Sequence, residues 1–560
     1  MKLRSSEEIQ AEYERWLKAC SEQDLICEMQ NMDAAAVEDA FYRDLAFGTG
    51  GLRGIIGAGT NRMNVYTVAR ASKGLADYIK RHFMQPSIAI SYDSRIKSDV
   101  FARRAAEVFA CEGLRVFLYP CLMPTPCLSY AVRFLDCSAG IMITASHNPS
   151  EYNGYKVYGS DGCQITEAAA EEILADIEKQ DTFEDVKFAS FDSALRNGTV
   201  SYIGEDCYTS YIEEVKKQSV LFGDKINRDL AIVYSPLNGT GLKPVTRVLH
   251  ESGFTNITVV KEQEQPDGSF STCPYPNPEI REAMELGLRV CKETGADLLL
   301  ATDPDCDRCG IAVKTAEGYR LLTGNEVGLL LLDFICAQRS AHGRMPEKPV
   351  FVKTIVTMDL AEKIAEHYRV RTINVLTGFK YIGETIGRLE AEGRQNDYIC
   401  GFEESYGYLT GSYVRDKDAV NAALMICEMF AWYKTRGISL QEKLDSIFGF
   451  YGYCKNTLHS YTFAGSSGML RMAEVMQSFR NNVNEIAGRP VVSLLDYSLG
   501  IDMLPKSNVL KFYLKDASVV IRPSGTEPKL KVYVSVTAGN EEKAAETEVE
   551  IAEFMKFRIA

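Results

Sequence analysis

The sequence predicts an α/β protein of three tandem α/β domains with mainly parallel, mixed sheets, followed by a smaller C-terminal α+β domain. Three observations support this fold class. The chain has 560 residues, which at about 150 residues per domain corresponds to roughly four domains. Short strands rich in β-branched residues or leucine recur in groups of three, separated by helix-like stretches. The third strand of every group ends in a dense polar motif.

Each group has the order strand, helix, strand, helix, strand. Apolar runs of this length suit strands that are buried on both faces, as in a parallel sheet. The predicted strands are Pro86–Asp93, Gly113–Pro120 and Gly140–Ser146 in the first group, Asp229–Pro236, Asn256–Glu262 and Ala296–Asp303 in the second, and Pro349–Val356, Arg371–Gly378 and Asp397–Glu404 in the third. Ligands of open α/β sheets bind beyond the carboxyl ends of the strands. The motifs TASHNP, ATDPDCDR and GFEESYG are therefore expected to face one central cleft.

The C-terminal part of the chain has a different pattern. Asn508–Leu514, Ser518–Ile521 and Lys529–Val536 are predicted to be neighbouring antiparallel strands, and a charged helix over Glu541–Phe557 closes the chain. The predicted domains are 1–210 with an N-terminal helical extension, 211–324, 325–458 and 459–560.

Composition excludes several functional classes. The formal net charge of −14 disfavours a nucleic-acid surface, which would be basic. The sequence contains no apolar run near the ~20 residues of a membrane span, and its N-terminal segment is charged, without the apolar core of a signal peptide. We expect a cytoplasmic protein without nucleic-acid or membrane partners. The 16 cysteines are scattered, and Cys306 and Cys309 form a CxxC without a second pair at zinc spacing, so reduced thiols are expected.

Ser146 stands where the predicted strand of ITASHNPSEYNGYK ends. It is a candidate helix N-cap. A serine hydrolase would usually show GxSxG at such a turn, and those glycines are missing. A hydroxyl beside the imidazole of His147 and the ammonium of Lys156 is instead suited to accept and release a phosphoryl group.

The motif DPDCDR places Asp303, Asp305 and Asp307 at alternate positions, on one side of an extended chain. Carboxylates this close repel one another unless a cation holds them, and oxygen ligands select a hard ion such as Mg²⁺. A calcium-binding EF-hand is excluded because Arg308 and Lys314 occupy the positions of its glycine and glutamate. The other possibility is a solvated acidic turn.

The remaining motifs are less specific. FGTGGLRG is neither a Walker A loop nor GxGxxG, but it places Arg53 on a glycine-rich backbone. The acids of GFEESYG suit either sugar hydroxyls or a helix N-terminus. RPSGTEPK suits either a phosphate or a simple hairpin turn.

Together these motifs resemble the α-D-phosphohexomutase superfamily over nearly the whole chain, in the same order and at similar spacing. The branch most similar is that of the phosphoglucomutases, which includes phosphopentomutases. TASHNP together with DPDCDR carries the resemblance, and the other motifs support it. The resemblance implies an isomerase with four domains around one cleft.

The resemblance also implies residue roles. Ser146 would carry a phosphoryl group and, with Asp303, Asp305 and Asp307, would bind Mg²⁺. Arg53, His147, Lys156 and Arg308 would surround the transferring group. Further implied substrate contacts are Glu403 and Ser405 to the sugar hydroxyls, Arg522, Ser524, Gly525 and Thr526 to a phosphate, and Gly378, Phe379 and Lys380 to the two orientations of the substrate.

The implied reaction interconverts glucose 1-phosphate and glucose 6-phosphate through glucose 1,6-bisphosphate. Many relatives have glycine and histidine where this chain has Tyr406 and Gly407. The FEESYG form favours glucose, with mannose and pentose phosphates as alternatives. A Mg²⁺-dependent sugar phosphatase and a non-catalytic sugar-phosphate-binding protein are more remote alternatives, and the sequence leaves open whether the protein is a monomer or a dimer.

Overall fold

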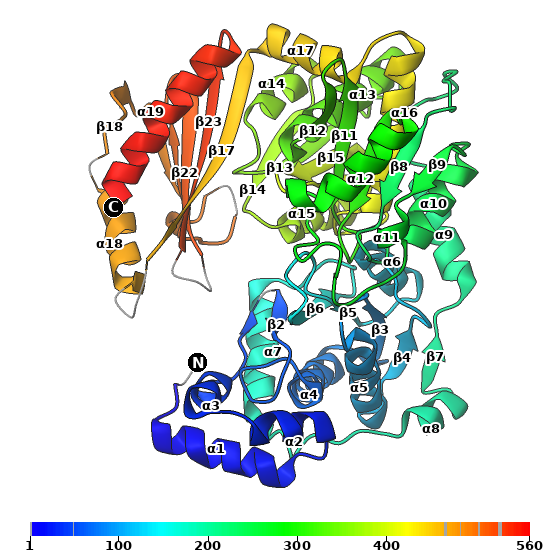
Figure 1. The fold of residues 1–560 in the computed structure, drawn as a ribbon, viewed down its shortest axis with the longest axis vertical. Helices are drawn as coiled ribbons and strands as arrows, with labels where there is room; N and C mark the ends of the chain where they lie inside the picture. The colour runs from blue at the N-terminus through cyan, green and yellow to red at the C-terminus, as the bar shows by residue number, and fades with distance from the viewer. Residues whose placement is uncertain are drawn as a thin grey trace.

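The computed structural model describes residues 3–48, 50–463, 468–481, 483–501, 504–524 and 529–559. Figure 1 shows the chain running in an arc, from N-terminal helices through three α/β units to a C-terminal unit at the other end. Four sheets organise these units. First, second, third and fourth domain denote below the parts of the chain built around these sheets in order.

Three helices precede the first sheet, and they pack on one another through a small core that contains Trp16 and Phe41. They are α1 (Ser6–Ala19), α2 (Gln23–Gln30) and α3 (Ala34–Phe41). Ser5 begins α1 as its N-cap and forms a reciprocal capping box with Glu8, an arrangement that satisfies free N–H groups of the first turn.

The first domain has a seven-stranded sheet in the order β1-β2-β6-β5-β3-β4-β7. Its strands are β1 (Phe47–Gly48), β2 (Gly51–Ile55), β3 (Ser87–Tyr92), β4 (Arg115–Leu118), β5 (Ala139–Ile143), β6 (Tyr152–Gly159) and β7 (Val200–Tyr202). The helices are α4 (Val65–His82), α5 (Ser98–Cys111), α6 (Thr125–Phe134), α7 (Glu167–Lys179) and α8 (Phe191–Arg196). Because β6 returns antiparallel beside β5, the segment between these two strands is a tight loop at the end of the sheet.

The second domain follows α9 (Glu205–Lys216) and has a sheet in the order β12-β11-β10-β8-β9. Its strands are β8 (Ile232–Ser235), β9 (Ile257–Val259), β10 (Leu298–Thr302), β11 (Cys309–Thr315) and β12 (Gly318–Leu322), and its helices are α10 (Leu242–Glu251), α11 (Lys261–Glu264) and α12 (Arg281–Thr294).

The third domain has the order β14-β13-β15-β16. Its strands are β13 (Val350–Thr354), β14 (Arg371–Val375), β15 (Tyr398–Glu403) and β16 (Gly407–Thr410). Its helices are α13 (Gly324–Ala341), α14 (Leu360–His367), α15 (Phe379–Ala391), η1 (Gln395–Asp397), α16 (Ala419–Thr435) and α17 (Leu440–Tyr451).

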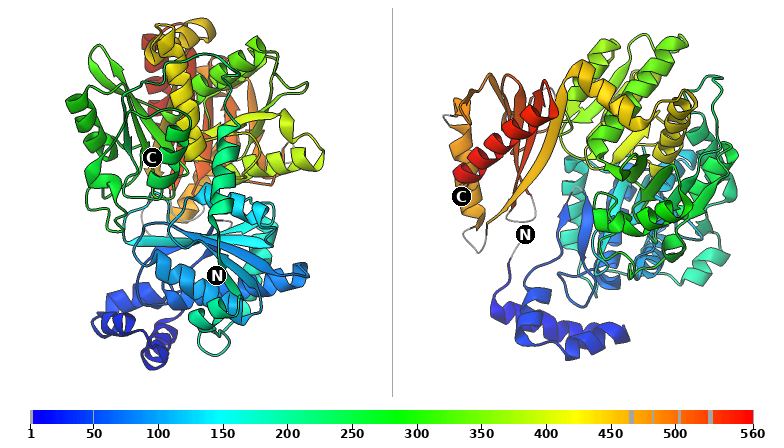
Figure 2. Two further views of the ribbon diagram at one scale, coloured as in Figure 1. Left: turned by 90° about the vertical axis from the view of Figure 1, so that its right-hand side faces the viewer. Right: turned by 45° about the horizontal axis from the view of Figure 1, so that its top comes forward.

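The fourth domain has an antiparallel sheet in the order β17-β23-β22-β21-β20, and Figure 2 shows α19 lying on one face of it. Its strands are β17 (Tyr453–Thr462), β20 (Ser493–Asp496), β21 (Leu510–Tyr513), β22 (Ala517–Pro523) and β23 (Lys529–Ala538), with a small hairpin of β18 (Glu485–Ile486) and β19 (Arg489–Pro490). The helices are α18 (Gly468–Arg480), η2 (Tyr497–Leu499) and α19 (Glu541–Ile559).

The predicted fold class is confirmed. All nine strands of the three groups form, and within each group they pair in parallel: β3 with β4 and β5, β8 with β9 and β10, and β13 with β14 and β15. The predicted strands and helix of the fourth domain also form, with antiparallel pairing. The sequence analysis did not place the antiparallel partners β6, β11 and β16, which turn the chain back beside the third strand of each group.

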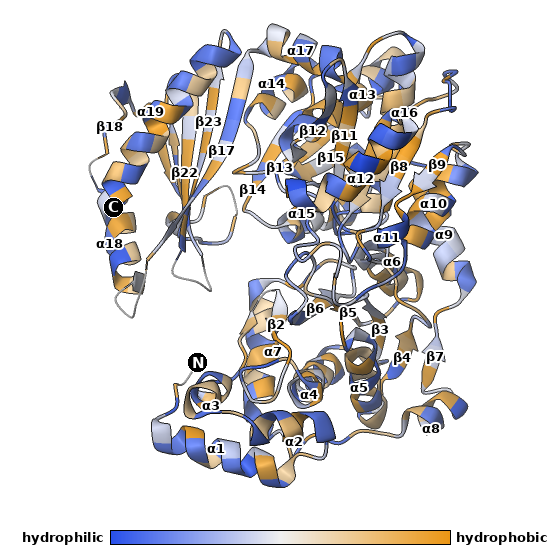
Figure 3. Cartoon of the chain, in the orientation of Figure 1, coloured by the Kyte–Doolittle hydropathy of each residue, from blue (hydrophilic) through white to orange (hydrophobic). Residues whose placement is uncertain are grey.

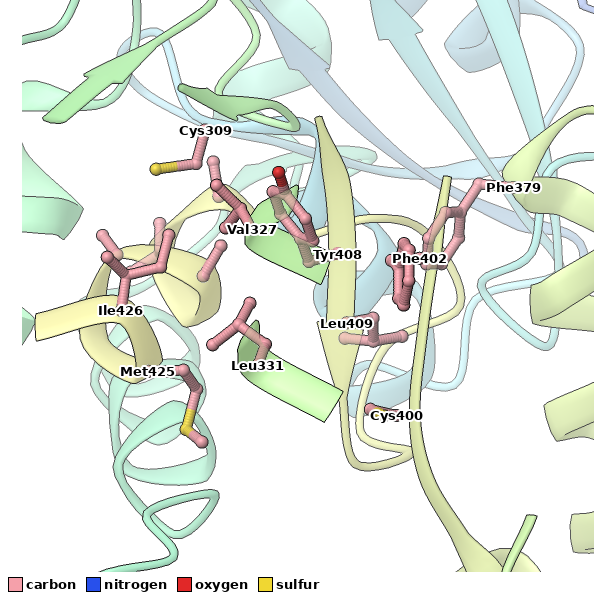
Figure 4. Packing of buried hydrophobic residues seen from close by; sticks show 14 of the residues in the cluster. Cys309, Val327, Leu331, Phe379, Cys400, Phe402, Tyr408, Leu409, Met425 and Ile426 are labelled. Carbon is pink, nitrogen blue, oxygen red and sulfur yellow. The ribbon is translucent and has the colours of Figure 1, made fainter. Parts of the chain in front are cut away.

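One hydrophobic cluster contains residues of all four domains, and further separate clusters lie within the first, second and fourth domains. Figure 3 shows apolar residues concentrated on the strands and on the helix faces that cover them. In the third domain Leu331 of α13 and Ile426 of α16 pack beside the strands that carry Phe402 and Leu409 (Figure 4). The apolar stretch of α13 includes Asp333, whose carboxylate pairs with Lys443. Among the helices in the described parts of the chain, none is long and apolar enough to cross a membrane.

A buried ion-pair cluster joins the third and fourth domains. Lys511 on β21 donates to Asp359 Oδ1 at 2.8 Å and to the carbonyl of Ile355 at 3.0 Å. Ser518 donates to the other oxygen of Asp359 at 2.5 Å, and the Lys353 ammonium lies 3.3 Å from the same carboxylate. Burial alone would raise the pKa of Asp359, but the two lysines outweigh it and lower this pKa well below its ordinary value.

The Asp359→Asn variant is expected to lose about 3 kcal/mol of unfolding free energy, because it leaves the buried Lys511 ammonium without its carboxylate partner, whereas Lys353 keeps Glu362 at 3.0 Å. The lowered pKa means that the carboxylate stabilises the fold above its unfolded pKa of about 4, and that this contribution is lost as the pH falls. Urea denaturation of Asp359→Asn, Lys511→Met and the double variant measures the coupling free energy between Asp359 and Lys511. The double variant should lose less than the sum of the single variants; strict additivity would contradict the cluster.

Candidate active site

The polar motifs at the ends of β5, β10 and β15 meet in the structure. The hydroxyl of Ser146, after β5, donates to Asp303 Oδ2, after β10, at 2.9 Å. Lys417, which follows β16 of the third domain, donates to Asp307 Oδ2 at 2.8 Å. Side chains from three domains therefore contact one another around a single point, as the equivalent positions of the three motifs predict.

Ser146 does not cap a helix, because the loop that contains it runs directly into strand β6. The residue is buried and has a left-handed backbone with φ of 53°. Its N–H donates to Thr144 Oγ1 at 2.8 Å, and its hydroxyl lies 3.1 Å from His147 Nδ1. A non-glycine residue in this conformation costs of order 1–3 kcal/mol and persists where surrounding contacts hold it. The loop thus fixes the Ser146 hydroxyl toward the aspartates.

Asp303, Asp305 and Asp307 are all buried, and one oxygen of each lies within 4.8 Å of the others. The backbone N–H groups of Asp307 and Arg308 donate to Asp303 Oδ1 at 3.0 and 2.9 Å, which folds the loop around this carboxylate. Cys306 takes a left-handed φ of 52° at the bend. The motif is therefore a buried cluster rather than a solvated turn.

These carboxylates fit a hard divalent cation. Asp305 Oδ1 and Asp307 Oδ1 are buried without a hydrogen-bond partner among the described residues, and such orphaned oxygens are costly unless something binds them. Three carboxylates with no nitrogen or sulfur ligand form the donor set that Mg²⁺ prefers.

Electrostatics in the cluster are uneven. Burial, together with the neighbouring carboxylates, raises the pKa of Asp303 well above its ordinary value. Burial also acts on Asp305, but the ammonium of Lys156, which donates to Asp305 Oδ2 at 2.8 Å, lowers its pKa. A bound cation would favour the ionised form of all three groups.

His147 and Arg308 flank the serine. Burial and the positive charges of Arg308 and Arg53 lower the pKa of His147 well below its ordinary value, so the imidazole is neutral near pH 7 and able to accept a proton. Arg308 forms an ion pair with Glu279 and lies 4.0 Å from Asp303 and Asp307.

Arg53 lies on β2, which pairs with β6 immediately beyond the serine loop, the segment of residues 144–152 from the end of β5 to the first residue of β6. Its guanidinium donates to Asn148 Oδ1 at 3.3 Å. Pairing of β2 with β6 therefore brings the glycine-rich motif to the serine loop, which the sequence spacing alone does not show.

Glu403 at the end of β15 is buried and accepts a hydrogen bond from the N–H of Gly378 at 2.9 Å. This contact brings the FEESYG and GFK motifs together. Burial raises the pKa of Glu403 to about 7. Ser405 lies in the turn before β16, only partly buried, so its hydroxyl can face a ligand.

The GFK motif begins α15, with Gly378 at the N-cap. The Phe379 side chain is buried in the core (Figure 4), so a ligand contact from this position has to come from the backbone. Lys380 donates to Glu167 of α7 at 2.8 Å and so joins the third domain to the first.

Part of the RPSGTEPK motif lies outside the described residues. Arg522 belongs to β22 and Ser524 follows it, whereas Gly525 and Thr526 are not described. Arg522 acts electrostatically on Tyr381 of α15, which places the end of β22 near the third domain.

Two further residues of this site, Lys417 and Thr125, are not among those predicted from the sequence. Lys417 is partly buried and belongs to the run VRDKDAV, whose alternating charges resemble a solvated surface. The only signal in the sequence is the position of this run, directly after strand β16 and before the apolar helix α16. Thr125 donates to Asp305 Oδ2 at 2.9 Å from the start of α6, and nothing in its sequence context distinguishes it.

Comparison with known proteins identifies the family. Models of the phosphoglucomutase/phosphomannomutase family match α/β/α domain I at residues 44–184, domain II at 209–318, domain III at 323–451 and the C-terminal domain at 471–554. The chain is 35% identical over 522 residues to a phosphoglucomutase of Staphylococcus haemolyticus, covering 91% of this chain and 93% of that protein. It is 36% identical over 521 residues to one of Staphylococcus aureus, covering 91% and 92%.

Solved structures share the fold. A phosphoglucomutase/phosphomannomutase family protein of Burkholderia thailandensis superposes with a TM-score of 0.68 at 17% identity, covering 91% of this chain and 97% of that one. The open form of parafusin, a phosphoglucomutase from Paramecium, gives 0.66 at 18% identity, covering 92% and 95%. With four family domains in order and relatives above 30% identity over nine-tenths of its length, the chain belongs to the phosphoglucomutase/phosphomannomutase family and is an isomerase of the mutase type.

Proposed function

We propose that the protein is a phosphoglucomutase that interconverts α-D-glucose 1-phosphate and glucose 6-phosphate through a phosphoserine at Ser146 and a glucose 1,6-bisphosphate intermediate. The observation that carries the proposal is the 2.9 Å contact between the Ser146 hydroxyl and Asp303, within a buried cluster of three aspartates. A strained serine aimed at a cation site is suited to hold and release a phosphoryl group.

In the proposed first step the 6-hydroxyl of glucose 1-phosphate attacks the phosphorus of phosphoserine 146. The new O–P bond forms as the bond from phosphorus to Ser146 Oγ breaks, and the bisphosphate results. After the intermediate turns over, Ser146 Oγ attacks the phosphorus of the C1 phosphate. The bond from that phosphorus to the C1 oxygen breaks, this oxygen takes up a proton, and glucose 6-phosphate leaves. Phosphate is conserved, so the phosphoenzyme is regenerated.

The chain's own groups have distinct proposed tasks. Asp303, Asp305 and Asp307 would hold Mg²⁺, which when bound would offset negative charge on the transferring group. Arg308 and Arg53 contribute positive charge beside Ser146. The neutral His147, 3.1 Å from the serine hydroxyl, is a candidate to accept a proton, and the Lys156 ammonium is a candidate to donate one.

The sugar and its distal phosphate are assigned to the other two domains. Glu403 and Ser405 would read sugar hydroxyls, and Gly378, Phe379 and Lys380 would help to accommodate both orientations. The phosphate that does not react would lie against Arg522, Ser524, Gly525 and Thr526. A second phosphate-binding site favours a mutase over a phosphatase, because a mutase has to retain the bisphosphate while this intermediate reverses its orientation.

The initial rate on glucose 1-phosphate tests this proposal. The assay contains Mg²⁺ and a trace of glucose 1,6-bisphosphate, and couples glucose 6-phosphate to NADPH formation. Mannose 1-phosphate and ribose 1-phosphate run in parallel with product-specific detection. Fast turnover of glucose 1-phosphate is expected, whereas release of inorganic phosphate without isomerised sugar would overturn the mutase in favour of a phosphatase. Because its proposed substrates are free sugar phosphates, we place the enzyme in the cytoplasm.

The value of kcat/KM is expected to fall as the pH drops through about 7, because burial raises the pKa of Glu403 to about 7 and its carboxylate accepts stronger, charge-assisted hydrogen bonds from sugar hydroxyls than the protonated acid does. The substrate phosphate titrates near pH 6, so the Glu403→Gln variant provides the reference. This variant should have a lower kcat/KM. Its pH profile should show only the decline near pH 6 that comes from ionisation of the substrate phosphate. An unchanged limb near pH 7 in Glu403→Gln would contradict the assignment; Glu392→Gln, at an exposed position, is the control.

A further inference from the structure

A further contact between the first and second domains lies next to the serine loop, at the turn that follows β3. Arg95 in this turn is almost completely buried. Its guanidinium Nη1 donates to the carbonyls of Pro149 and Tyr152 at 2.8 and 3.0 Å. Its Nη2 donates to the carbonyl of Ser146 at 2.6 Å and to that of Asn148. One side chain therefore binds four carbonyls of the loop that carries the nucleophile.

This contact explains how the strained conformation of the loop is maintained. The carbonyls from Ser146 to Tyr152 converge on one point, which would leave buried acceptors unsatisfied without a donor between them. The planar fork of arginine supplies several donors with fixed directions, whereas a lysine ammonium supplies a single point charge. Arg95 thus holds Ser146, with its φ of 53°, in the orientation that aims the hydroxyl at Asp303.

The second domain holds Arg95 in turn. The buried ring of Phe270, in the segment between α11 and α12, lies 5.0 Å from the Arg95 guanidinium carbon. Two residues earlier, Gly268 packs so closely that an added Cβ would lie 2.6 Å from the N of Ile96 and 2.8 Å from the O of Ser94. The domain that carries the three aspartates therefore packs directly on the turn that fixes the serine loop.

We propose that Arg95, held by Phe270 and Gly268, is a positioning residue that sets the distance between Ser146 and the aspartate cluster. The packing of the two domains at this point, remote from the sugar, then determines the efficiency of phosphoryl transfer. The kinetic part of this inference rests on the proposed function, whereas its structural part does not. A purely structural arginine would instead affect stability without a selective effect on the serine loop.

The test uses two variants. Arg95→Lys keeps the positive charge but loses the planar set of guanidinium donors, and Phe270→Leu keeps an apolar side chain but loses the aromatic ring. Both variants are expected to lower kcat by about 10- to 100-fold, since a displacement of about 1 Å at a reacting group has an effect of that size. The KM for glucose 1-phosphate should change less than about twofold, because the sugar and distal phosphate are assigned to the third and fourth domains.

Hydrogen–deuterium exchange separates this inference from the proposed function. In Arg95→Lys the amides of residues 146–152 should exchange faster, while those of β10 keep their protection. This readout requires no mutase activity. If the wild-type chain lacks that activity, the proposed function fails and the exchange result still decides the role of Arg95.

A matched control is available in the same domain. Arg104 of α5 stacks on Phe188 with its guanidinium carbon 4.2 Å from the ring centroid, away from the serine loop. Arg104→Lys and Phe188→Leu should leave kcat and loop exchange unchanged. Folded Arg95→Lys and Phe270→Leu proteins with wild-type kcat and unchanged exchange of residues 146–152 would overturn the inference. If Arg95→Lys does not fold, Phe270→Leu and Gly268→Ala decide the inference by the same two measurements, kcat and the amide exchange of residues 146–152.

Discussion

Replacement of Ser146 by alanine is expected to lower kcat on glucose 1-phosphate by about 10⁵- to 10⁶-fold, the size of loss seen when a covalent nucleophile is removed. Alanine leaves no oxygen to carry the phosphoryl group, and no other described hydroxyl occupies the position 2.9 Å from Asp303. The KM of any residual activity should stay near that of the wild type, because the Ser146 hydroxyl contacts the aspartate cluster and His147 rather than the proposed sugar site. The coupled NADPH assay measures both constants.

The control for Ser146→Ala is Ser150→Ala, four positions further along the same loop. This variant should keep at least about half of the wild-type kcat. The fold of Ser146→Ala is checked by circular dichroism, since the substitution keeps a non-glycine residue in the left-handed region. A folded Ser146→Ala protein with more than about 1% of the wild-type kcat would contradict a serine relay.

Replacement of Asp307 by asparagine is expected to lower kcat at least about 100-fold and to raise the Mg²⁺ concentration needed for half-maximal activity. Loss of partners that only support metal ligands already costs 10- to 100-fold, and here a proposed ligand itself loses its charge. The substitution preserves side-chain volume, so the effect reports charge and ligation. Mg²⁺ titration of activity and calorimetric Mg²⁺ binding measure the two effects separately.

The same variant distinguishes two interpretations of the buried aspartates. If Asp307 served only to pair with Lys417, 2.8 Å away, Asp307→Asn would lower stability and leave the Mg²⁺ dependence unchanged. That outcome would contradict the proposal that these aspartates bind Mg²⁺. Asp516→Asn, at an exposed turn of the fourth domain, provides the control for the loss of one aspartate charge.

The fold could be predicted to the extent that apolar runs define it. β3, β8 and β13 are short, buried and parallel to both neighbours, so their sequences are mostly apolar, with single polar residues such as Lys353, and are easily recognised. β6 was missed because its sequence, YNGYKVYG, contains turn-forming and charged residues that serve the site. Its strand conformation follows from pairing with β5 and β2, which is a tertiary effect.

The site could be predicted in part for a related reason. Ser146 and Asp303 are recognisable because unusual polar motifs follow apolar strands. Their contact across 157 positions of sequence is set by domain packing. Arg95 lacks such a local signal, and Lys417 shows only a weak one, because a cation enclosed by the fold is identified by what surrounds it. Burial, and the carbonyls or carboxylates that compensate for it, exist only in the folded chain.

The most direct test of the central claim is transfer of phosphate to Ser146. The purified protein is incubated with [³²P]glucose 1,6-bisphosphate, and the labelled peptide is located by tryptic digestion and tandem mass spectrometry. Cleavage after Arg133 and Lys156 isolates Ser146 in one peptide. The account predicts up to about one label per chain, located on Ser146, which unlabelled glucose 1-phosphate removes with formation of labelled bisphosphate. Label on another residue, or loss of label only to water, would contradict it.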